Sequence, residues 1–207
     1  MAAVMTSVAG CRDAAPATDF TDSELALIRE VGIRSIEESE AVPPGTMRVL
    51  TIEDSDDLAV LRARSTDLSD SSLLSEDYSA LCSLMVATVT HPSQDGVGIA
   101  GPQVGLNRRV VAVQRFDKEG EPFEVYPNIR IVLASDSLEP GPEGCLSVPD
   151  RRGDVLRSQE IVIEYTSTDG CLDCELKRVQ ERVNGFTAVI FQHEIDHLEG
   201  VLYIDRL

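Results

Sequence analysis

The stretch Phe191-Gln-His-Glu-Ile-Asp-His197 decides how this sequence is read. On a helix, residues four positions apart lie on one face, so the imidazoles of His193 and His197 can bind one metal ion. Glu194 lies beside the first imidazole, where its carboxylate can reach water at the ion and act as a general base. The chain has only three histidines, and two of them fall in this motif. The pattern therefore predicts a helix that carries a metal site.

The same segment carries an apolar stripe. Asn184 can cap the helix and Gly200 can end it, which predicts a helix from Gly185 to about Glu199. Three apolar residues recur at helical spacing on the face of His193 and predict a wall for a hydrophobic substrate side chain: Phe186, Val189 and Ile190.

Two histidines do not complete a metal site. An HExxH-type metallopeptidase normally takes its third ligand downstream, but only ten residues follow His197, and Glu199 and Asp205 lack the required spacing. We therefore expect the third ligand upstream. The motif alone leaves two other interpretations open: an HExxH-type metallopeptidase and a non-catalytic metal-binding module.

Composition narrows the class of protein. The length of 207 residues suits one well-buried domain, and the formal net charge is −18. A surface of this charge repels phosphate backbones, so we predict no nucleic-acid partner. No apolar run approaches the roughly 20 residues that cross a bilayer, so we predict no membrane span.

Element signals predict an α+β fold, with mixed or antiparallel sheets around a central C-terminal metal-binding helix. Thr21 and Glu24 form a capping box for a short N-terminal helix to about Val31. We assign 1–45 to a tail with this helix and 46–207 to the catalytic domain, with the break at Pro43-Pro-Gly45. The remaining predicted elements are a second helix from Ser75 to about Val89 and strands at Arg109–Gln114, Pro122–Leu133, Gln159–Thr166 and Leu176–Arg182.

The five cysteines do not form a disulfide framework. Cys82 lies on an apolar helical stripe and is predicted to be a core thiol. Cys171 and Cys174 form a CxxC at a predicted hairpin tip, which we interpret as structural or incidental in preference to a redox or second metal site. Cys11 ends a lipoprotein-like Ser-Val-Ala-Gly-Cys, but no Lys or Arg precedes it, so a cytoplasmic location is favoured and an exported, anchored form is left open.

Two upstream segments carry further signals. Gly96-Val-Gly-Ile-Ala-Gly-Pro-Gln-Val-Gly105 is dense in glycine but lacks the Lys of a phosphate loop. Its glycines allow close backbone approach, and Gln103 offers an amide donor. Glu143-Gly-Cys-Leu-Ser147 lies between prolines, which suggests a rigid, extended loop.

Together and in this order, the segments Gly96–Gln103, Glu143–Ser147 and His193–His197 resemble the three signature motifs of the peptide deformylases. The resemblance covers most of the chain from Met47 onward. It implies that Cys145, His193 and His197 bind one divalent ion, with water in the fourth position. Family members typically use Fe²⁺, and the ligand set also suits Zn²⁺, Ni²⁺ or Co²⁺.

The resemblance also implies the reaction, which is removal of the formyl group from N-formylmethionyl peptides with release of formate. Glu194 would be the acid–base residue, and the N–H of Leu146 and the amide of Gln103 would hold the oxyanion. The Met side chain would contact an apolar wall, and Gly98 would admit the substrate backbone. The wall residues are Val97, Phe186, Val189 and Ile190.

Three details qualify the resemblance. Gly101 stands where the family usually has Ala, which we expect to leave the chemistry intact. The sequence shows no basic extension after the metal helix, so we do not expect ribosome docking by that route. Arg157 and Asp196 are predicted to form a buried pair that orients the metal helix.

Overall fold

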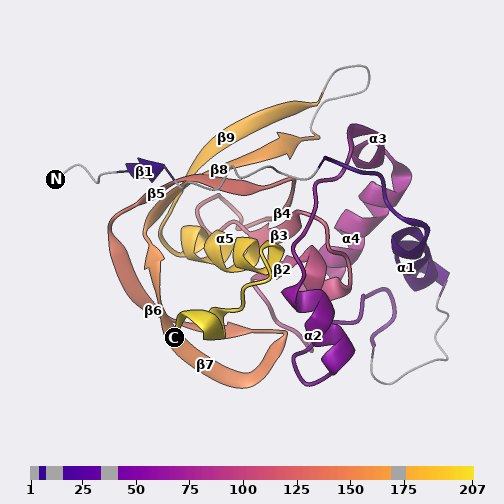
Figure 1. Cartoon of the computed structure of the whole chain (residues 1–207), viewed down its shortest axis with the longest axis horizontal. Helices are drawn as coiled ribbons and strands as arrows, with labels where there is room; N and C mark the ends of the chain where they lie inside the picture. Colours follow the sequence, from indigo (N-terminus) through magenta and orange to yellow (C-terminus); the bar gives the residue numbers. More distant parts are fainter. Residues whose placement is uncertain (1–4, 8–15, 34–41, 169–175) are drawn as a thin grey trace.

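The computed structural model describes residues 5–7, 16–33, 42–168 and 176–207, which form an α+β fold (Figure 1). The helices are α1 (Asp22–Ile33), α2 (Ser55–Arg62), α3 (Asp70–Leu73), α4 (Glu76–Thr90) and α5 (Gly185–Leu198), with the 3₁₀ turns η1 (Gly101–Val104) and η2 (Tyr203–Arg206). The strands are β1 (Met5–Ser7), β2 (Gly98–Ala100), β3 (Val110–Gln114), β4 (Phe123–Pro127), β5 (Arg130–Ser135), β6 (Leu138–Cys145), β7 (Val148–Ser158), β8 (Glu160–Ser167) and β9 (Lys177–Asn184).

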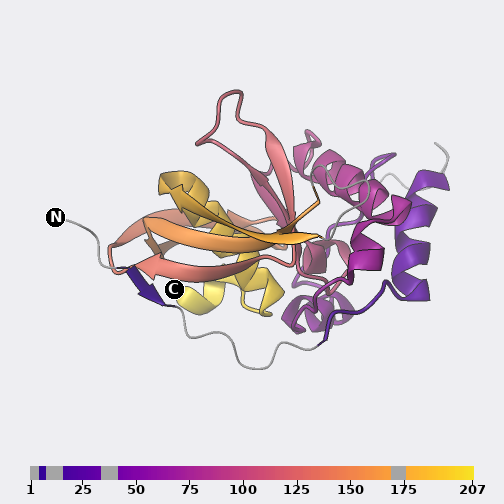
Figure 2. The same ribbon diagram turned by 90° about the horizontal axis from the view of Figure 1, so that it is seen from above.

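Antiparallel pairing joins these strands into three sheets. Their strand orders are β1-β5-β8-β9, β2-β3-β4 and β6-β7. Figure 1 shows α5 in the middle of the molecule, with the β6–β7 hairpin curving around it. Figure 2, seen from above, shows α1 and α4 on the side of the molecule opposite β1.

Helix α5 is held in the core by its apolar side chains. Ala188, Phe191 and Leu198 are completely buried and pack with residues of β3 and β8 in one hydrophobic cluster. Burial of apolar surface at roughly 25 cal/mol per Å² favours this position strongly. The motif His193–His197 is thereby placed on a rigid, enclosed element.

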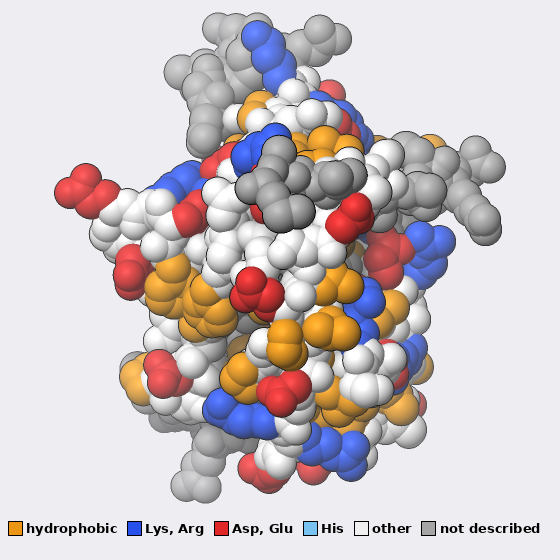
Figure 3. Space-filling view, turned by 90° about the vertical axis from the view of Figure 1, so that its left-hand side faces the viewer, with side chains coloured by type: hydrophobic (Ala, Val, Ile, Leu, Met, Phe, Trp, Pro, Cys, Tyr) orange, Lys and Arg blue, Asp and Glu red, His pale blue; other side chains and the backbone are white. Residues whose placement is uncertain are grey.

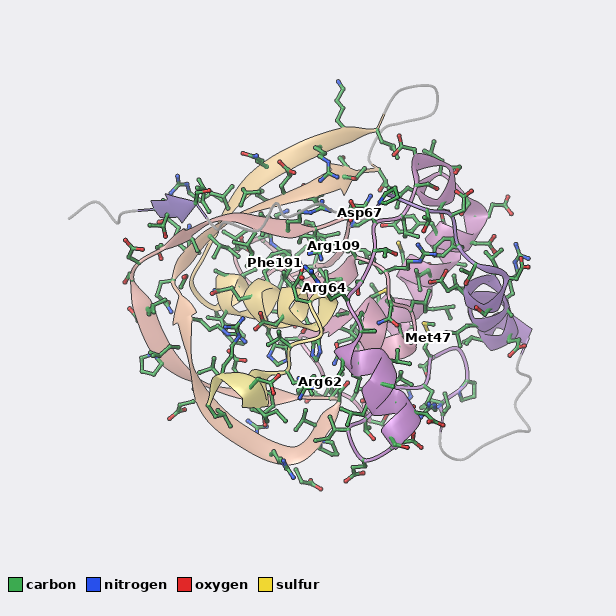
Figure 4. The ribbon with its side chains drawn as sticks, in the orientation of Figure 1. Met47, Arg62, Arg64, Asp67, Arg109 and Phe191 are labelled. Atoms are coloured by element: carbon green, nitrogen blue, oxygen red, sulfur yellow. The ribbon has the colours of Figure 1, made fainter. Side chains whose placement is uncertain are left out.

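The C-terminal end of α5 is fixed by charges from two other segments. Arg109 and Arg64 both donate to the carboxylate of Glu199, at 2.6 and 2.5 Å. Figure 4 shows these two arginines beside the helix end. Gly200 then adopts a φ of +74°, and a Cβ at this position would lie 2.3 Å from the carbonyl oxygen of Arg62. The predicted helix stop is confirmed.

The N-terminal region packs on the domain through both charge and apolar contacts. The capping box is present, because the Thr21 N–H donates to Glu24 and the Glu24 N–H donates to Thr21. Arg108, which is buried, pairs with Glu24 at 2.7 Å, and Ile28 enters the same hydrophobic cluster as α4. Within the segment that the sequence suggested was a tail, β1 pairs with β5.

The predicted helices around α1, α4 and α5 and the predicted strands are confirmed within a few residues. The segment from 122 to 133 divides into β4 and β5, because Asn128 adopts a φ of +54° between them. The segment around Cys145 is the turn of the β6–β7 hairpin and its flanking strands, where we expected an extended loop. Helices α2 and α3 were not predicted, although Asp54 and Ser69 cap them with their side chains.

Of the cysteine predictions, the structure tests the one for Cys82. Cys82 is largely buried on α4, and burial raises the pKa of its thiol to about 11, as expected for a core cysteine. Cys11, Cys171 and Cys174 lie outside the described residues.

No helix among the described residues has the length and apolar character to cross a bilayer. On the face shown in Figure 3, acidic, basic and hydrophobic side chains are interspersed, and the Lys and Arg side chains do not form a continuous basic surface. Among the described residues of this face, therefore, no basic patch offsets the net charge of −18.

Candidate metal centre

Two distant segments bring three ligand atoms together. Cys145 ends β6, whereas His193 and His197 lie one turn apart on α5. The sulfur of Cys145 and one nitrogen of each imidazole all lie within 4.8 Å of one another, and Cys145 Sγ is 3.2 Å from His197 Nε2. In a tetrahedral site with ordinary metal–ligand bond lengths, such atoms are about 3.5 Å apart. The cluster could hold one metal ion.

His193 is oriented by a carboxylate that we did not assign from the sequence. Its Nδ1 lies 2.8 Å from Oε2 of Glu143, so Nε2 is the nitrogen directed to the cluster. Arg157 holds Glu143 in turn through Nε and Nη2, at 2.7 and 2.9 Å. Carboxylates commonly orient metal-binding histidines in this way. The sequence did contain a signal that could have identified Glu143, since this residue stands two positions before Cys145.

The electrostatics of the cluster favour a cation. Burial alone would lower the pKa of His193, but hydrogen bonds to Cys145 and Glu143 outweigh it and raise this pKa to about 10. Burial and the nearby positive charges lower the pKa of His197 well below its ordinary value, so this imidazole is neutral. A divalent ion bound here would replace the proton on His193, so that two imidazoles and the Cys145 sulfur become its donors.

Glu194 lies beside the cluster without an ion pair. It is buried, and its Oε2 has no hydrogen-bond partner among the described residues. Burial raises the pKa of this carboxyl to about 7, although His193 opposes the shift. A carboxyl with this pKa can accept and return a proton near neutral pH.

Gly98 leaves room for this carboxylate. A Cβ at Gly98 would lie 2.5 Å from Oε1 of Glu194 and 2.9 Å from Cγ2 of Ile190. Ordinary Cβ atoms do not approach other atoms this closely. The glycine therefore allows β2 to pass directly against α5, in addition to the substrate approach that we predicted for it.

Gln103 is anchored with its amide pointing toward the cluster. Its Oε1 accepts from the Ala100 N–H at 2.8 Å, and its Nε2 lies 3.3 Å from Ser147 Oγ and 3.5 Å from Cys145 Sγ. The side chain is 1% exposed, so its orientation is enforced by packing. Leu146 follows Cys145 in the turn of the hairpin and lines the cavity that opens over the cluster.

A cavity of about 780 Å³ opens over these residues. Its lining includes all five residues that we predicted to contact substrate: Val97, Gly98, Phe186, Val189 and Ile190. Phe186 is 56% exposed, so it borders the entrance of the cavity. Gln103, Cys145, His193 and Glu194 also line it. His197 is not among the lining residues and is 1% exposed.

The predicted pair of Arg157 and Asp196 is present, with Nη1 and Oδ2 2.6 Å apart. His91, the third histidine of the chain, follows α4 and contacts Ser93. The site as a whole has the geometry of a metal-dependent hydrolase. A possible Cys-His-His metal site, a buried carboxyl with a raised pKa and an amide donor meet in one partly apolar cavity.

Comparison with known proteins agrees with this class. The sequence model of polypeptide deformylases matches residues 47–207. The chain is 36% identical to a peptide deformylase of Caulobacter vibrioides over 162 residues, which cover 77% of this chain and 87% of that protein. It also resembles the crystal structure of the peptide deformylase from Thermotoga maritima, with 33% identity and a TM-score of 0.66, over 78% of this chain and 97% of that one.

A class I type b peptide deformylase from Acinetobacter baumannii, crystallised with Met-Ala-Ser, gives 32% identity and a TM-score of 0.66 over 82% of this chain and 100% of that one. The chain belongs to the polypeptide deformylase family. It is a hydrolase that removes the N-formyl group from N-formylmethionyl peptides, and neither the peptidase nor the non-catalytic interpretation is favoured.

Proposed function

We propose that Cys145, His193 and His197 bind one divalent ion, Fe²⁺ by family resemblance, and that the cavity above them is the deformylase active site. The support is the convergence of the three ligand atoms, two of which come from one turn of α5 and the third from a hairpin. When bound, the ion supplies Lewis-acid chemistry, making water nucleophilic near neutral pH and polarising the formyl carbonyl.

Glu194 performs the proton transfers in this proposal. Its buried carboxylate takes a proton from the attacking water and returns one to the departing amine, which yields formate and a free N-terminus. The raised pKa of about 7 suits both steps, and the unpartnered Oε2 is able to receive a proton. Gly98 keeps this carboxylate close to β2.

Two donors stabilise the negative charge that develops on the formyl oxygen. The Gln103 amide is fixed by its bond to Ala100, and its Nε2 is directed toward Cys145. The backbone N–H of Leu146 is the second donor, at the turn after Cys145. Donors that are held in place before the reaction stabilise a transition state without reorganisation.

The methionine side chain occupies the apolar part of the cavity. Val189 and Ile190 line its wall together with Val97, which directly precedes β2, and Phe186 borders the entrance. The Acinetobacter relative was crystallised with Met-Ala-Ser, which supports a methionine-first peptide as the ligand of this cavity. We further propose a cytoplasmic site of action on new chains and no nucleic-acid partner, consistent with the charge of −18.

The test is formate release from formyl-Met-Ala-Ser by the protein loaded with Fe²⁺ under anaerobic conditions. Glu194→Gln should keep its metal and lose at least about 10²–10⁴-fold in rate, since it cannot transfer the proton. Cys145→Ala should lose the metal. An active Glu194→Gln variant would exclude the mechanism, and casein cleavage by the wild type would point to a peptidase. For protein purified with its own metal and not reloaded, activity that decays in air would indicate iron, whereas stable aerobic activity would indicate zinc or nickel.

A further inference from the structure

An uninterrupted series of ion pairs leads from His193 to the surface. Glu143 contacts His193, and Arg157 contacts both Glu143 and Asp196. Beyond Asp196, the series continues to Arg206 of η2, which donates from Nε and Nη2 to the two carboxylate oxygens, each at 2.5 Å. The series alternates in charge and connects η2 with a candidate metal ligand.

From Arg157 outward, burial decreases along this series. The exposed fraction of the side chain is 4% for Arg157, 13% for Asp196 and 43% for Arg206. Buried Arg157 thus depends on Asp196 for one of its two carboxylate partners. Asp196 is in turn held in a two-point contact by Arg206, and such bidentate pairs fix orientation more strictly than single contacts.

The same 3₁₀ turn reaches His193 by a second route. The ring of Tyr203 stacks against the His193 ring, with centroids 6.1 Å apart and planes inclined by 24°. Tyr203 is buried with Val148 and Val155 of β7 in one cluster that also contacts Cys145. Turn η2 therefore bridges α5 and the β6–β7 hairpin, which carry the two imidazoles and the thiol.

We propose that Arg206 is a positioning residue for the metal site. By fixing Asp196, it holds Arg157 and Glu143 in the orientation that directs Nε2 of His193 to the ion. This inference rests on the proposed function, because it requires Cys145, His193 and His197 to be the metal ligands.

The main alternative is a purely structural surface pair. An exposed ion pair contributes little to stability, and its loss would leave the metal site unchanged. The effect of the charge of Arg206 on metal affinity and the effect of its positioning role have opposite signs. Removing the positive charge of Arg206 would by itself favour a cation at the site. A weaker affinity for metal must therefore come from lost orientation, not from the change in charge.

The experiment measures Co²⁺ binding to the apo-protein by chelator competition, together with the absorption bands of cobalt and its thiolate. Arg206→Gln should weaken Co²⁺ binding roughly 3- to 10-fold, somewhat less than the loss of a residue that contacts a ligand directly, and should shift the d–d bands. The thiolate charge-transfer band should remain, because Cys145 is unaffected. Unchanged affinity and spectrum would overturn the proposal.

Arg64→Gln is the matched control. Arg64 is also an exposed arginine paired with a carboxylate at the end of α5, but its partner Glu199 keeps Arg109 and lies outside the series. This variant should bind Co²⁺ like the wild type. An equal loss in both variants would show a general loosening of α5 and would also overturn the proposal.

A double-mutant cycle tests whether Arg206 acts through Asp196. If it does, Arg206→Gln should have no further effect on Co²⁺ affinity in an Asp196→Asn background. Additive losses would contradict the proposal. A wild-type protein that binds Co²⁺ without a thiolate band would instead refute the proposed ligand set, so the two failures are distinguishable.

Discussion

Oε2 of Glu143 lies 2.8 Å from Nδ1 of His193, where Glu143 is buried and His193 is largely buried. This contact fixes which nitrogen of the imidazole faces Cys145 and His197. Burial would raise the pKa of Glu143, but Arg157 and His193 lower it to about 2, so the carboxylate is charged at any physiological pH. The orientation of His193 is therefore maintained over the physiological pH range.

Glu143→Gln should weaken metal binding by about 10- to 100-fold, because the neutral amide holds the imidazole less strongly and Arg157 loses a charged partner. The measurement is metal content after dialysis against graded chelator. Glu139→Gln, on the exposed part of the same strand, is the control and should match the wild type. Equal metal retention in the two variants would argue against a positioning role for Glu143.

Gly98→Ala should lower kcat/KM by about 10- to 100-fold, since the new methyl group would displace the Glu194 carboxylate, and small misplacements of a catalytic group are costly. Metal content should stay normal because the atoms nearest to the added methyl group belong to Glu194 and Ile190, not to a candidate ligand. Formate release and metal analysis on the same sample check this. Full activity would show that β2 can shift without disturbing Glu194.

Gly101→Ala should destabilise the fold by about 1–3 kcal/mol. A Cβ would lie 2.7 Å from the carbonyl oxygens of Leu106 and Arg108, and backbone atoms cannot move aside as a side-chain end can. Our expectation from sequence considered only the chemistry. Urea denaturation is the measurement, with Gly141→Ala as control because nothing lies within 4 Å of a Cβ there. Equal midpoints would contradict the argument.

Glu24→Gln should reduce stability by about 1–3 kcal/mol at neutral pH, because buried Arg108 loses its charged partner. Burial raises the pKa of Glu24, but hydrogen bonds from Arg108 and Thr21 outweigh it, and the net pKa lies below the ordinary 4.5. The stabilisation is therefore complete above pH 4.5 and declines as the pH falls through the folded-state pKa.

The difference in unfolding free energy between wild type and Glu24→Gln should accordingly shrink on acidification below pH 4.5. Chemical denaturation across a pH series measures it. Glu30→Gln, at an exposed position of the same helix, should show no such dependence. A difference that stays constant to low pH would mean that the ion pair with Arg108 is not its source.

Local signals in the sequence were reliable where a few neighbouring residues determine the outcome. Thr21 and Glu24 cap α1, Ser75 caps α4 with its side chain, and Gly200 adopts the left-handed conformation after α5. The β6–β7 hairpin was missed because its strands contain prolines and exposed residues and lack the alternation that identifies a half-buried strand.

The sequence by itself determined the family, the helix that carries His193 and His197, and the identity of every proposed ligand, because these depend on residue types at short spacing. Only the tertiary structure decided that Glu143 orients His193, that Gly98 makes room for Glu194 and that Arg206 reaches this network through Asp196. Such contacts join segments far apart in the chain. They arise from burial and packing of whole elements, for which no local pattern exists.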